Sequence, residues 1–181
     1  KKRAEDEKEN PNKDVDARAR ASADAEVVRT LAPRALVSVL ETDGGFARIG
    51  KGEWVALSDL RIAKKVARPD GIGENERWVD VDLDQAVLMG YEGDTPVYAT
   101  LVSTGRRNGT PTGIYRIDNK IALTTIASGD HAKGKWRHPD TPFTMRFRHR
   151  YALHGAYWHD RFGNDGSMGC VNLTPEDARW V

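Results

Sequence analysis

Short segments of alternating apolar and polar residues, separated by glycine-rich turns, run through the chain from residue 27 onwards. Such short strands bounded by turns are typical of barrel and sandwich folds. The clearest segment is Trp78–Leu83, whose strict alternation places Val79, Val81 and Leu83 on one face. A helix is predicted only near the C-terminal end, with Thr174 as N-cap and Pro175 as the first helical residue. These patterns predict a mainly β protein with one late helix.

Composition divides the chain into four parts. Residues 1–26 contain fifteen charged residues, seven basic and eight acidic, and almost no large apolar side chain. This part cannot bury enough surface to offset the entropy of ordering it, so we predict a charged linker or arm. Residues 27–66 are predicted to form a small β module, and residues 67–76 a connector rich in helix- and strand-breaking residues. Residues 77–181 then form a larger, mostly β domain.

Several short strands are predicted inside the two domains. In the first they are 36–40, 46–49 and 54–56; in the second they are 78–83, a hairpin of 85–91 and 97–103, 114–117 and 144–153. Gly52-Glu53-Trp54-Val55, followed by Ser58-Asp59-Leu60, resembles bacterial SH3-like domains. The first domain is therefore interpreted as a small SH3-like barrel. It would either attach the protein to the cell wall or a partner, or pack beside the larger domain.

Charge and hydropathy restrict the partners of the chain. The net charge is +1, but residues 103–150 contain ten Lys or Arg against three acids. This local excess is compatible with an anionic ligand and equally with a solvated basic face. The basic residues carry no nucleic-acid-binding signature, so no nucleic-acid partner is predicted. No apolar run is long enough to form a transmembrane segment, and we expect any export signal to belong to a longer precursor.

The single cysteine, Cys170, excludes an internal disulfide and is a candidate nucleophile. It lies in Ser167-Met168-Gly169-Cys170-Val171-Asn172, just before the predicted helix. A thiol becomes a nucleophile when it is reachable and deprotonated, and a preceding glycine permits close approach of a substrate. Backbone N–H groups at such a turn can stabilise an oxyanion. Without a base nearby, a buried structural cysteine would be the simpler interpretation.

His154 is the candidate base, because it ends a strand-like run and is followed by Gly155. It precedes Cys170 by 16 residues (170 − 154), a separation that one loop can close. The order of the pair excludes papain-like and NlpC-type cysteine peptidases, in which the cysteine comes first. Caspases have the histidine first, but about fifty residues upstream and with a different cysteine context.

The motifs around this pair resemble the L,D-transpeptidase family, whose catalytic domain is YkuD-like. The segments that carry the resemblance are Trp78–Leu88, Val102–Gly105, Gly109–Ile117, Pro142–Phe147, His154-Gly155 and Ser167–Leu173. They follow one another in the order of the family, over residues 77–181. Met168 departs from the family pattern, which has a second histidine there, and a Met side chain cannot replace the hydrogen bonds or charge of that residue.

The resemblance implies roles for individual residues. Cys170 would be the nucleophile and His154 its base, with the main-chain carbonyl of Ser167 orienting the imidazole. N–H groups near Gly169 and Cys170 would hold the oxyanion. The residues expected to line the substrate site are Met168, Asn172, Tyr157, Trp158 and Arg146. Of these, Asn172 supports the turn, and Tyr157 and Trp158 either form a wall of the site or simply pack.

The resemblance also implies a substrate and a location. The donor would be a peptidoglycan stem tetrapeptide that loses its terminal D-Ala, in the bacterial cell envelope. The acceptor would be a second stem peptide or a wall-attached protein. Water as acceptor would make the enzyme an L,D-carboxypeptidase or a cross-link hydrolase, and a non-catalytic wall-binding protein is the alternative of another class. No cofactor is predicted. Neither is a metal, because the His residues show no paired ligand spacing.

Overall fold

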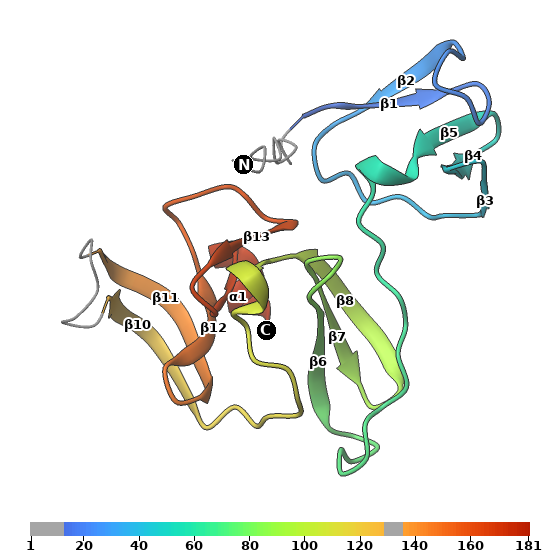
Figure 1. Ribbon diagram of the computed structural model, residues 1–181. Coiled ribbons are helices and arrows are strands. Elements are labelled where there is room, and N and C mark those ends of the chain that lie inside the picture. The colour runs from blue at the N-terminus through green and yellow to red at the C-terminus, as the bar shows by residue number, and fades with distance from the viewer. Residues whose placement is uncertain (1–12, 129–135) are drawn as a thin grey trace, which may run out of the picture. The chain divides into compact units, whose positions relative to one another are not determined.

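The computed structural model describes residues 13–128 and 136–181 (Figure 1). Contacts divide the chain into two compact units, with the division between Leu60 and Arg61. The secondary structure is mainly β, and α1 is the one α-helix among the residues described. The predicted fold class is confirmed.

The first unit contains a five-stranded antiparallel sheet in the order β2-β1-β5-β4-β3. The strands are β1 (Val15–Arg18), β2 (Val27–Leu31), β3 (Glu41–Asp43), β4 (Phe46–Gly50) and β5 (Glu53–Ala56), followed by a 3-10 turn at Leu57–Asp59. Ala17, Leu31 and Val55 form the centre of its small core. The comparison with SH3-like domains stays a prediction.

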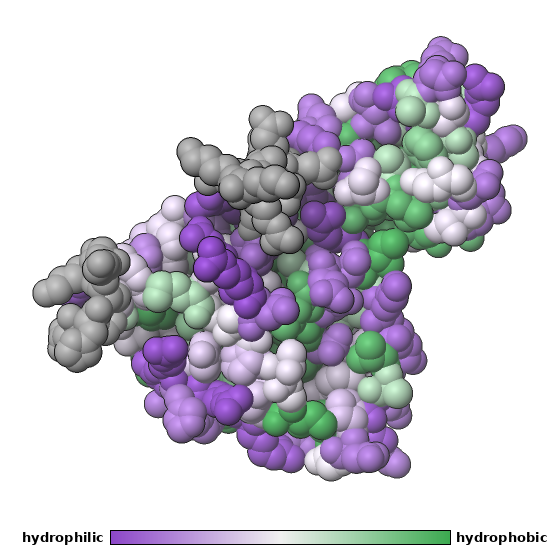
Figure 2. All heavy atoms as spheres, in the orientation of Figure 1, coloured by the Kyte–Doolittle hydropathy of each residue, from purple (hydrophilic) through white to green (hydrophobic). Residues whose placement is uncertain are grey.

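Two predictions for this unit were wrong. β1 lies in the segment expected to be a charged linker or arm, where Ala17 is completely buried between charged neighbours. Residues 1–12 of that segment lie outside the described residues. The strand expected at 36–40 is irregular. No strand among the described residues pairs with it, and Leu36 is 92% exposed. Figure 2 shows apolar residues at the surface of this unit, at the upper right.

The second unit begins with a three-stranded antiparallel sheet of β6 (Arg77–Asp82), β7 (Val87–Glu92) and β8 (Thr95–Leu101). This sheet confirms the predicted strand and the hairpin that follows it. At Gly90 of β7, any larger residue would collide with the helix, because a Cβ there would lie 2.8 Å from the ring of Trp180. The absence of a side chain at Gly90 therefore allows Trp180 of the C-terminal helix to pack directly against the sheet.

A six-stranded mixed sheet completes the second unit, in the order β10-β11-β12-β14-β9-β13. Its strands are β9 (Ser103–Gly105), β10 (Asn119–Ala127), β11 (Arg137–Arg148), β12 (Tyr151–Gly155), β13 (Asn164–Ser167) and β14 (Val171–Leu173), and a 3-10 turn spans Arg106–Asn108. β12 and β14 are parallel neighbours, so the segment between them crosses over the sheet. This pairing brings the His154 and Cys170 regions onto adjacent strands.

Two predicted strands in this unit differ from the structure. Residues 114–117 are irregular: no strand in the part of the chain that the structure describes pairs with them, and Ile114 is two-thirds exposed. Residues 144–153 are not one strand but the end of β11, a turn and β12. His149 takes a left-handed backbone conformation (φ 44°) in that turn.

Helix α1 (Pro175–Trp180) begins as predicted, because Thr174 Oγ1 accepts a hydrogen bond from the N–H of Asp177 at 3.1 Å. The Asp177 carboxylate holds the helix on β8, where it accepts from Tyr98 OH at 2.5 Å and from Thr100 Oγ1 at 2.8 Å. The Trp180 ring stacks on that of Tyr98 at 3.9 Å. Burial and this carboxylate raise the pKa of Tyr98 to about 12, so its hydroxyl stays protonated and able to donate even in mildly alkaline solution.

Replacing Asp177 by alanine is expected to destabilise the second unit by roughly 2–3 kcal/mol, because partly buried hydroxyl donors lose a charged acceptor. The neighbouring exposed acid supplies a matched control: Glu176→Ala should change the free energy of unfolding by less than about 0.5 kcal/mol. Urea unfolding of both variants measures the difference. Equal effects of the two substitutions would mean that Asp177 does not dock the helix.

Candidate active site

Side-chain alternation on β11, β12 and β14 gives the six-stranded sheet two distinct faces. Met145 pairs with Leu153, and Leu153 pairs with Val171, and all three belong to the apolar core that also contains Leu88 and Val102. Paired residues on neighbouring strands point to the same face, and successive residues point to opposite faces. The residues on either side of this apolar row therefore face away from the core.

Cys170 and His154 lie on that second face. His154 of β12 pairs with Asn172 of β14. Cys170 comes just before β14 and two residues before Asn172, so it lies diagonally across from His154 on the same face. With strands about 4.8 Å apart and a rise of about 3.3 Å per residue, the two Cα atoms are roughly 8 Å apart. An imidazole and a thiol can approach each other across such a diagonal. Cys170 is half-buried and His154 is 2% exposed.

The His154 imidazole is held by a main-chain carbonyl. Its Nδ1 lies 3.2 Å from the carbonyl oxygen of Gly155, whereas the expectation placed the carbonyl of Ser167 there. Burial lowers the pKa of His154 to about 4, so the imidazole is neutral near pH 7. With Nδ1–H donating to Gly155, Nε2 keeps the lone pair that a base needs.

Backbone packing shapes the turn before Cys170. Ser167 Oγ accepts a hydrogen bond from Gly169 N at 2.9 Å and donates one to Cys170 O at 2.5 Å. The N–H of Gly169 is thus already engaged, and the N–H of Cys170 becomes the better candidate for an oxyanion donor. Gly169 has φ +132°, and a Cβ there would lie 2.4 Å from the Tyr151 ring and 2.6 Å from the carbonyl oxygen of Gly109. Only glycine fits this position.

The loop after β9 supports this turn, a contact that the sequence did not predict. At Gly105, a Cβ would lie 2.8 Å from the Cα of Gly169, and the N–H of Gly105 donates to Thr110 Oγ1 at 2.7 Å. Gly105 and Gly109 frame a tight turn in which Arg107 and Asn108 both have positive φ. The two glycines were visible as a motif, but their contact with the cysteine turn depends on tertiary packing.

The Cys170 thiol is neutral at rest. Its Sγ lies 3.8 Å from the carbonyl oxygen of Arg150. Burial raises its pKa, while a backbone hydrogen bond at Ala152 and the charges of Arg146 and Arg150 act in the opposite direction. A neutral thiol beside a neutral imidazole needs a proton transfer before it can attack.

The structure brings Arg146 to the same face. Arg146 pairs with Ala152, and Cys170 lies opposite Ala152 when the β12–β14 register is continued by one residue. Arg146, Ala152 and Cys170 therefore form one row across three strands. Because alternate residues of a strand point to opposite faces, this register determines that Arg146 points to the face that carries Cys170.

The other residues expected at the site are spread around this face. Met168 is exposed. Tyr157 OH donates to the carbonyl of Pro139 at 2.6 Å, and the Trp158 ring stacks on His138 at 3.7 Å with planes 4° apart. Trp158 also lies 5.7 Å from the His154 ring, centroid to centroid. His138, which the sequence did not single out as a site residue, thus joins the aromatic residues next to the histidine.

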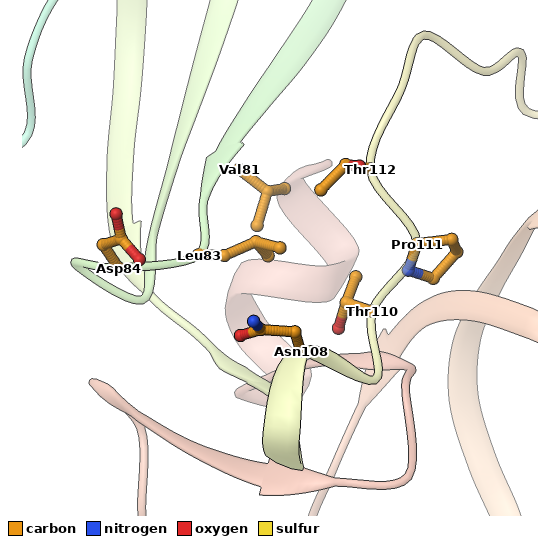
Figure 3. Close-up of a pocket in the computed structure, with 7 residues that line it drawn as sticks. All are labelled: Val81, Leu83, Asp84, Asn108, Thr110, Pro111 and Thr112. Carbon is orange, nitrogen blue, oxygen red and sulfur yellow. The ribbon is translucent and has the colours of Figure 1, made fainter.

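One cavity of about 620 Å³ lies beside the loop that supports the cysteine turn (Figure 3). It is lined by Val81, Leu83, Asp84, Asn108, Thr110, Pro111 and Thr112. Figure 3 shows these side chains coming from the end of β6, from the turn that follows it and from the loop after β9. None of the residues expected at the site lines this cavity.

Within residues 13–128 and 136–181, no group of three or more His, Cys, Asp or Glu residues is placed to hold a metal ion. The same part of the chain has no helix that is long and apolar enough to cross a membrane.

Comparison with solved structures places the fold among L,D-transpeptidases. A cysteine-to-serine mutant of the Enterococcus faecium L,D-transpeptidase matches with a TM-score of 0.53 and 20% identity, covering 60% of this chain and 45% of that one. An L,D-transpeptidase from Mycobacterium smegmatis matches with a TM-score of 0.54 and 18% identity, covering 80% and 75%. The chain thus spans less than half the length of the E. faecium protein. No curated protein sequence matches the chain significantly.

The family model for the YkuD L,D-transpeptidase catalytic domain matches residues 76–181. This segment covers more than half of the chain and contains both Cys170 and His154. The chain belongs to the YkuD family of L,D-transpeptidase catalytic domains. The resemblance seen in the sequence is confirmed.

Replacing Gly169 by alanine is expected to displace the cysteine turn, because the new Cβ would overlap the Tyr151 ring and a backbone oxygen. The variant should lose roughly 1–3 kcal/mol of stability, from positive-φ strain and overpacking. Gly73→Ala is a control, because a Cβ there would make only ordinary contacts with Glu76, at 3.8 Å, and Gly73 has no positive φ; it should be neutral. Thermal unfolding compares the two, and an unchanged midpoint for Gly169→Ala would contradict the packing described.

Proposed function

We propose that this chain is a peptidoglycan L,D-transpeptidase that works through a thioester on Cys170. The observation that carries the proposal is the register of β12 and β14, which puts Cys170 and a buried, neutral His154 on one face of adjacent strands. A neutral imidazole can accept the thiol proton, and a thiol supplies the nucleophile. Membership of the YkuD family supports the reaction class.

The reaction follows from these two groups. His154 Nε2 takes the thiol proton as Sγ of Cys170 rotates from the Arg150 carbonyl and attacks the carbonyl carbon next to the terminal D-Ala. The oxyanion that forms is stabilised by the N–H of Cys170. When the C–N bond breaks, His154 gives the proton to the departing amine of D-Ala and the thioester remains. An acceptor amine then attacks the thioester, its proton passes to His154, and Cys170 regains a proton as the new amide leaves.

Arg146 is proposed to bind a carboxylate of the stem peptide. It shares a row with Cys170, and its charge already acts on the thiol. The residues proposed to form the rest of the substrate site are Met168, Asn172, Tyr157 and Trp158. Because Met168 is exposed next to the turn, it can contact substrate through its thioether and methylene groups without supplying charge.

The bacterial cell envelope is the proposed location, because that is where stem peptides occur. The first unit is proposed to attach the enzyme to the cell wall or to a partner. A second stem peptide or a wall-attached protein would supply the acceptor amine. Water as acceptor would give carboxypeptidase or hydrolase activity through the same thioester.

Incubation of the purified chain with tetrapeptide muropeptides, followed by mass spectrometry, tests the proposal. A dimer that has lost one D-Ala is the expected product. Loss of D-Ala without a dimer would replace the transpeptidase with the hydrolytic enzyme. Unchanged muropeptides, together with no covalent adduct of a carbapenem on Cys170, would favour a non-catalytic wall-binding protein.

A further inference from the structure

Three buried side-chain oxygens in the described residues have no hydrogen-bond partner: Ser103 Oγ, Thr144 Oγ1 and Asn172 Oδ1. Each of the three side chains is at least 95% buried. A buried hydroxyl or amide oxygen without a partner costs roughly 1–3 kcal/mol, so three of them in one small domain need an explanation.

All three lie in one row of the six-stranded sheet. Ser103 pairs with Asn172, and Asn172 pairs with His154. Met145 pairs with Leu153 in an antiparallel ladder, so the next pair along it is Thr144 with His154. The row therefore runs Thr144, His154, Asn172, Ser103 across β11, β12, β14 and β9.

The row belongs to the face that carries Cys170. Val102, Met145, Leu153, Val171 and Leu173 alternate with its members along the strands, and all five lie in the apolar core on the other face. The polar side chains consequently point together toward the site side. Two protein groups lie against the row. A Cβ on Gly166 would lie only 2.7 Å from Ser103 Oγ, and His159 Nε2 lies 2.9 Å from Asn172 Nδ2.

We propose that this row binds internal water, with one molecule between Ser103 Oγ and Asn172 Oδ1 and another on Thr144 Oγ1 beside His154. Neighbouring strands are about 4.8 Å apart, a spacing that one water can bridge with two ordinary hydrogen bonds. Buried waters typically satisfy polar groups of this kind, and the Ser103 and Thr144 hydroxyls, at most 1% exposed, lie too deep for a peptide substrate to satisfy them.

Through these waters, Ser103 and Thr144 would act as positioning residues for His154. This role, unlike the water sites themselves, rests on the proposed function. The imidazole itself is held through Gly155 at one nitrogen. The water on Thr144 would restrict rotation of the ring, and the water on Ser103 would hold the amide of Asn172, the residue paired with His154. Filled polar networks of this kind rigidify a site, while unfilled ones destabilise it.

Other charged or titratable groups act on His154 and Cys170, and the variants that test the positioning role leave these groups unchanged. Those that act on His154 are His138 from β11 and His159 from the crossover segment; those that act on Cys170 are Arg146 and Arg150. The variants Ser103→Ala and Thr144→Val remove one hydroxyl each and alter none of these groups. Thr141→Val is the matched control, since the buried Thr141 hydroxyl donates to the His138 carbonyl at 3.0 Å.

A crystal structure of the full chain, at a resolution that reveals ordered water, tests the binding sites directly. Water within hydrogen-bond distance of Ser103 and Asn172, and a second at Thr144, is the expected result. A dry row, with the Ser103 hydroxyl bonded directly to Asn172, would overturn the inference. This test needs no substrate, so it can succeed even if the proposed function fails.

Alkylation of Cys170 by iodoacetamide as a function of pH tests the positioning role. Ser103→Ala and Thr144→Val should each shift the pH midpoint by about half a unit, which is a roughly threefold change in rate at a fixed pH below it. Thr141→Val should lose stability without moving the midpoint. Midpoints that stay at the wild-type value in both test variants would refute positioning.

Discussion

Cys170→Ala is expected to abolish both release of D-Ala and formation of a carbapenem adduct. The chain contains no other cysteine, so no second thiol can replace the nucleophile. Removal of the nucleophile from a covalent mechanism lowers turnover by roughly 10⁴-fold or more. Mass spectrometry of the intact protein measures the adduct, and muropeptide analysis measures the turnover.

Cys170→Ser separates loss of the nucleophile from loss of structure. Serine keeps the size of the side chain, so the turn held by Ser167 and Gly169 should stay intact and the unfolding midpoint should remain close to wild type. Its hydroxyl is far harder to deprotonate than a thiol, so turnover should still fall by orders of magnitude. Turnover at the wild-type rate in either variant would rule out the thioester mechanism.

Much of the second unit could be predicted because local rules and tertiary structure agree there. Strict alternation in Trp78–Leu83 gave the correct strand, and Thr174 with Pro175 gave the correct start of the only α-helix among the described residues. The Cys170–His154 pair was identifiable because both residues lie next to glycines at the ends of short segments. Its order excluded papain-like and NlpC-type peptidases, and its spacing and cysteine context excluded caspases.

Other features depend on contacts that the sequence does not display. β1 was missed because its buried residue, Ala17, is small and lies between charged residues. Leu36 was expected in a strand because it is apolar, yet no strand pairs with it. The carbonyl at His154 belongs to Gly155, which could be identified only from the ring orientation.

The register of the six-stranded sheet was the most informative feature that sequence could not supply. It decides that Arg146 faces Cys170, and it aligns Ser103, Asn172 and Thr144 with His154. A shift of one residue would turn each of these side chains to the apolar core. The sequence supplied the candidate chemistry, while strand pairing determines which groups can take part in it.

His154→Ala is expected to lower acylation of Cys170 by about 10²–10⁴-fold, the usual contribution of a positioned base. His149→Asn is the matched control: His149 is an exposed histidine in a left-handed turn, a conformation that asparagine tolerates. The control should acylate at the wild-type rate. An equal rate in His154→Ala would remove this residue from the mechanism.

The pH dependence of the wild type distinguishes a base from a residue that only supports the fold. Burial lowers the pKa of His154 to about 4, so the imidazole is neutral and able to accept a proton at any pH well above that value. Acylation should therefore persist through pH 6.5, where an ordinary histidine would be half protonated, and fall only as the pH approaches 4.

In His154→Ala this decline at acid pH should disappear. The rate should instead rise about tenfold per pH unit with the thiolate fraction, up to the raised pKa of Cys170. Stopped-flow measurement of carbapenem acylation between pH 4 and pH 9 would show the two profiles; a wild-type midpoint near 6.5 would mean that His154 is solvated and not buried as described.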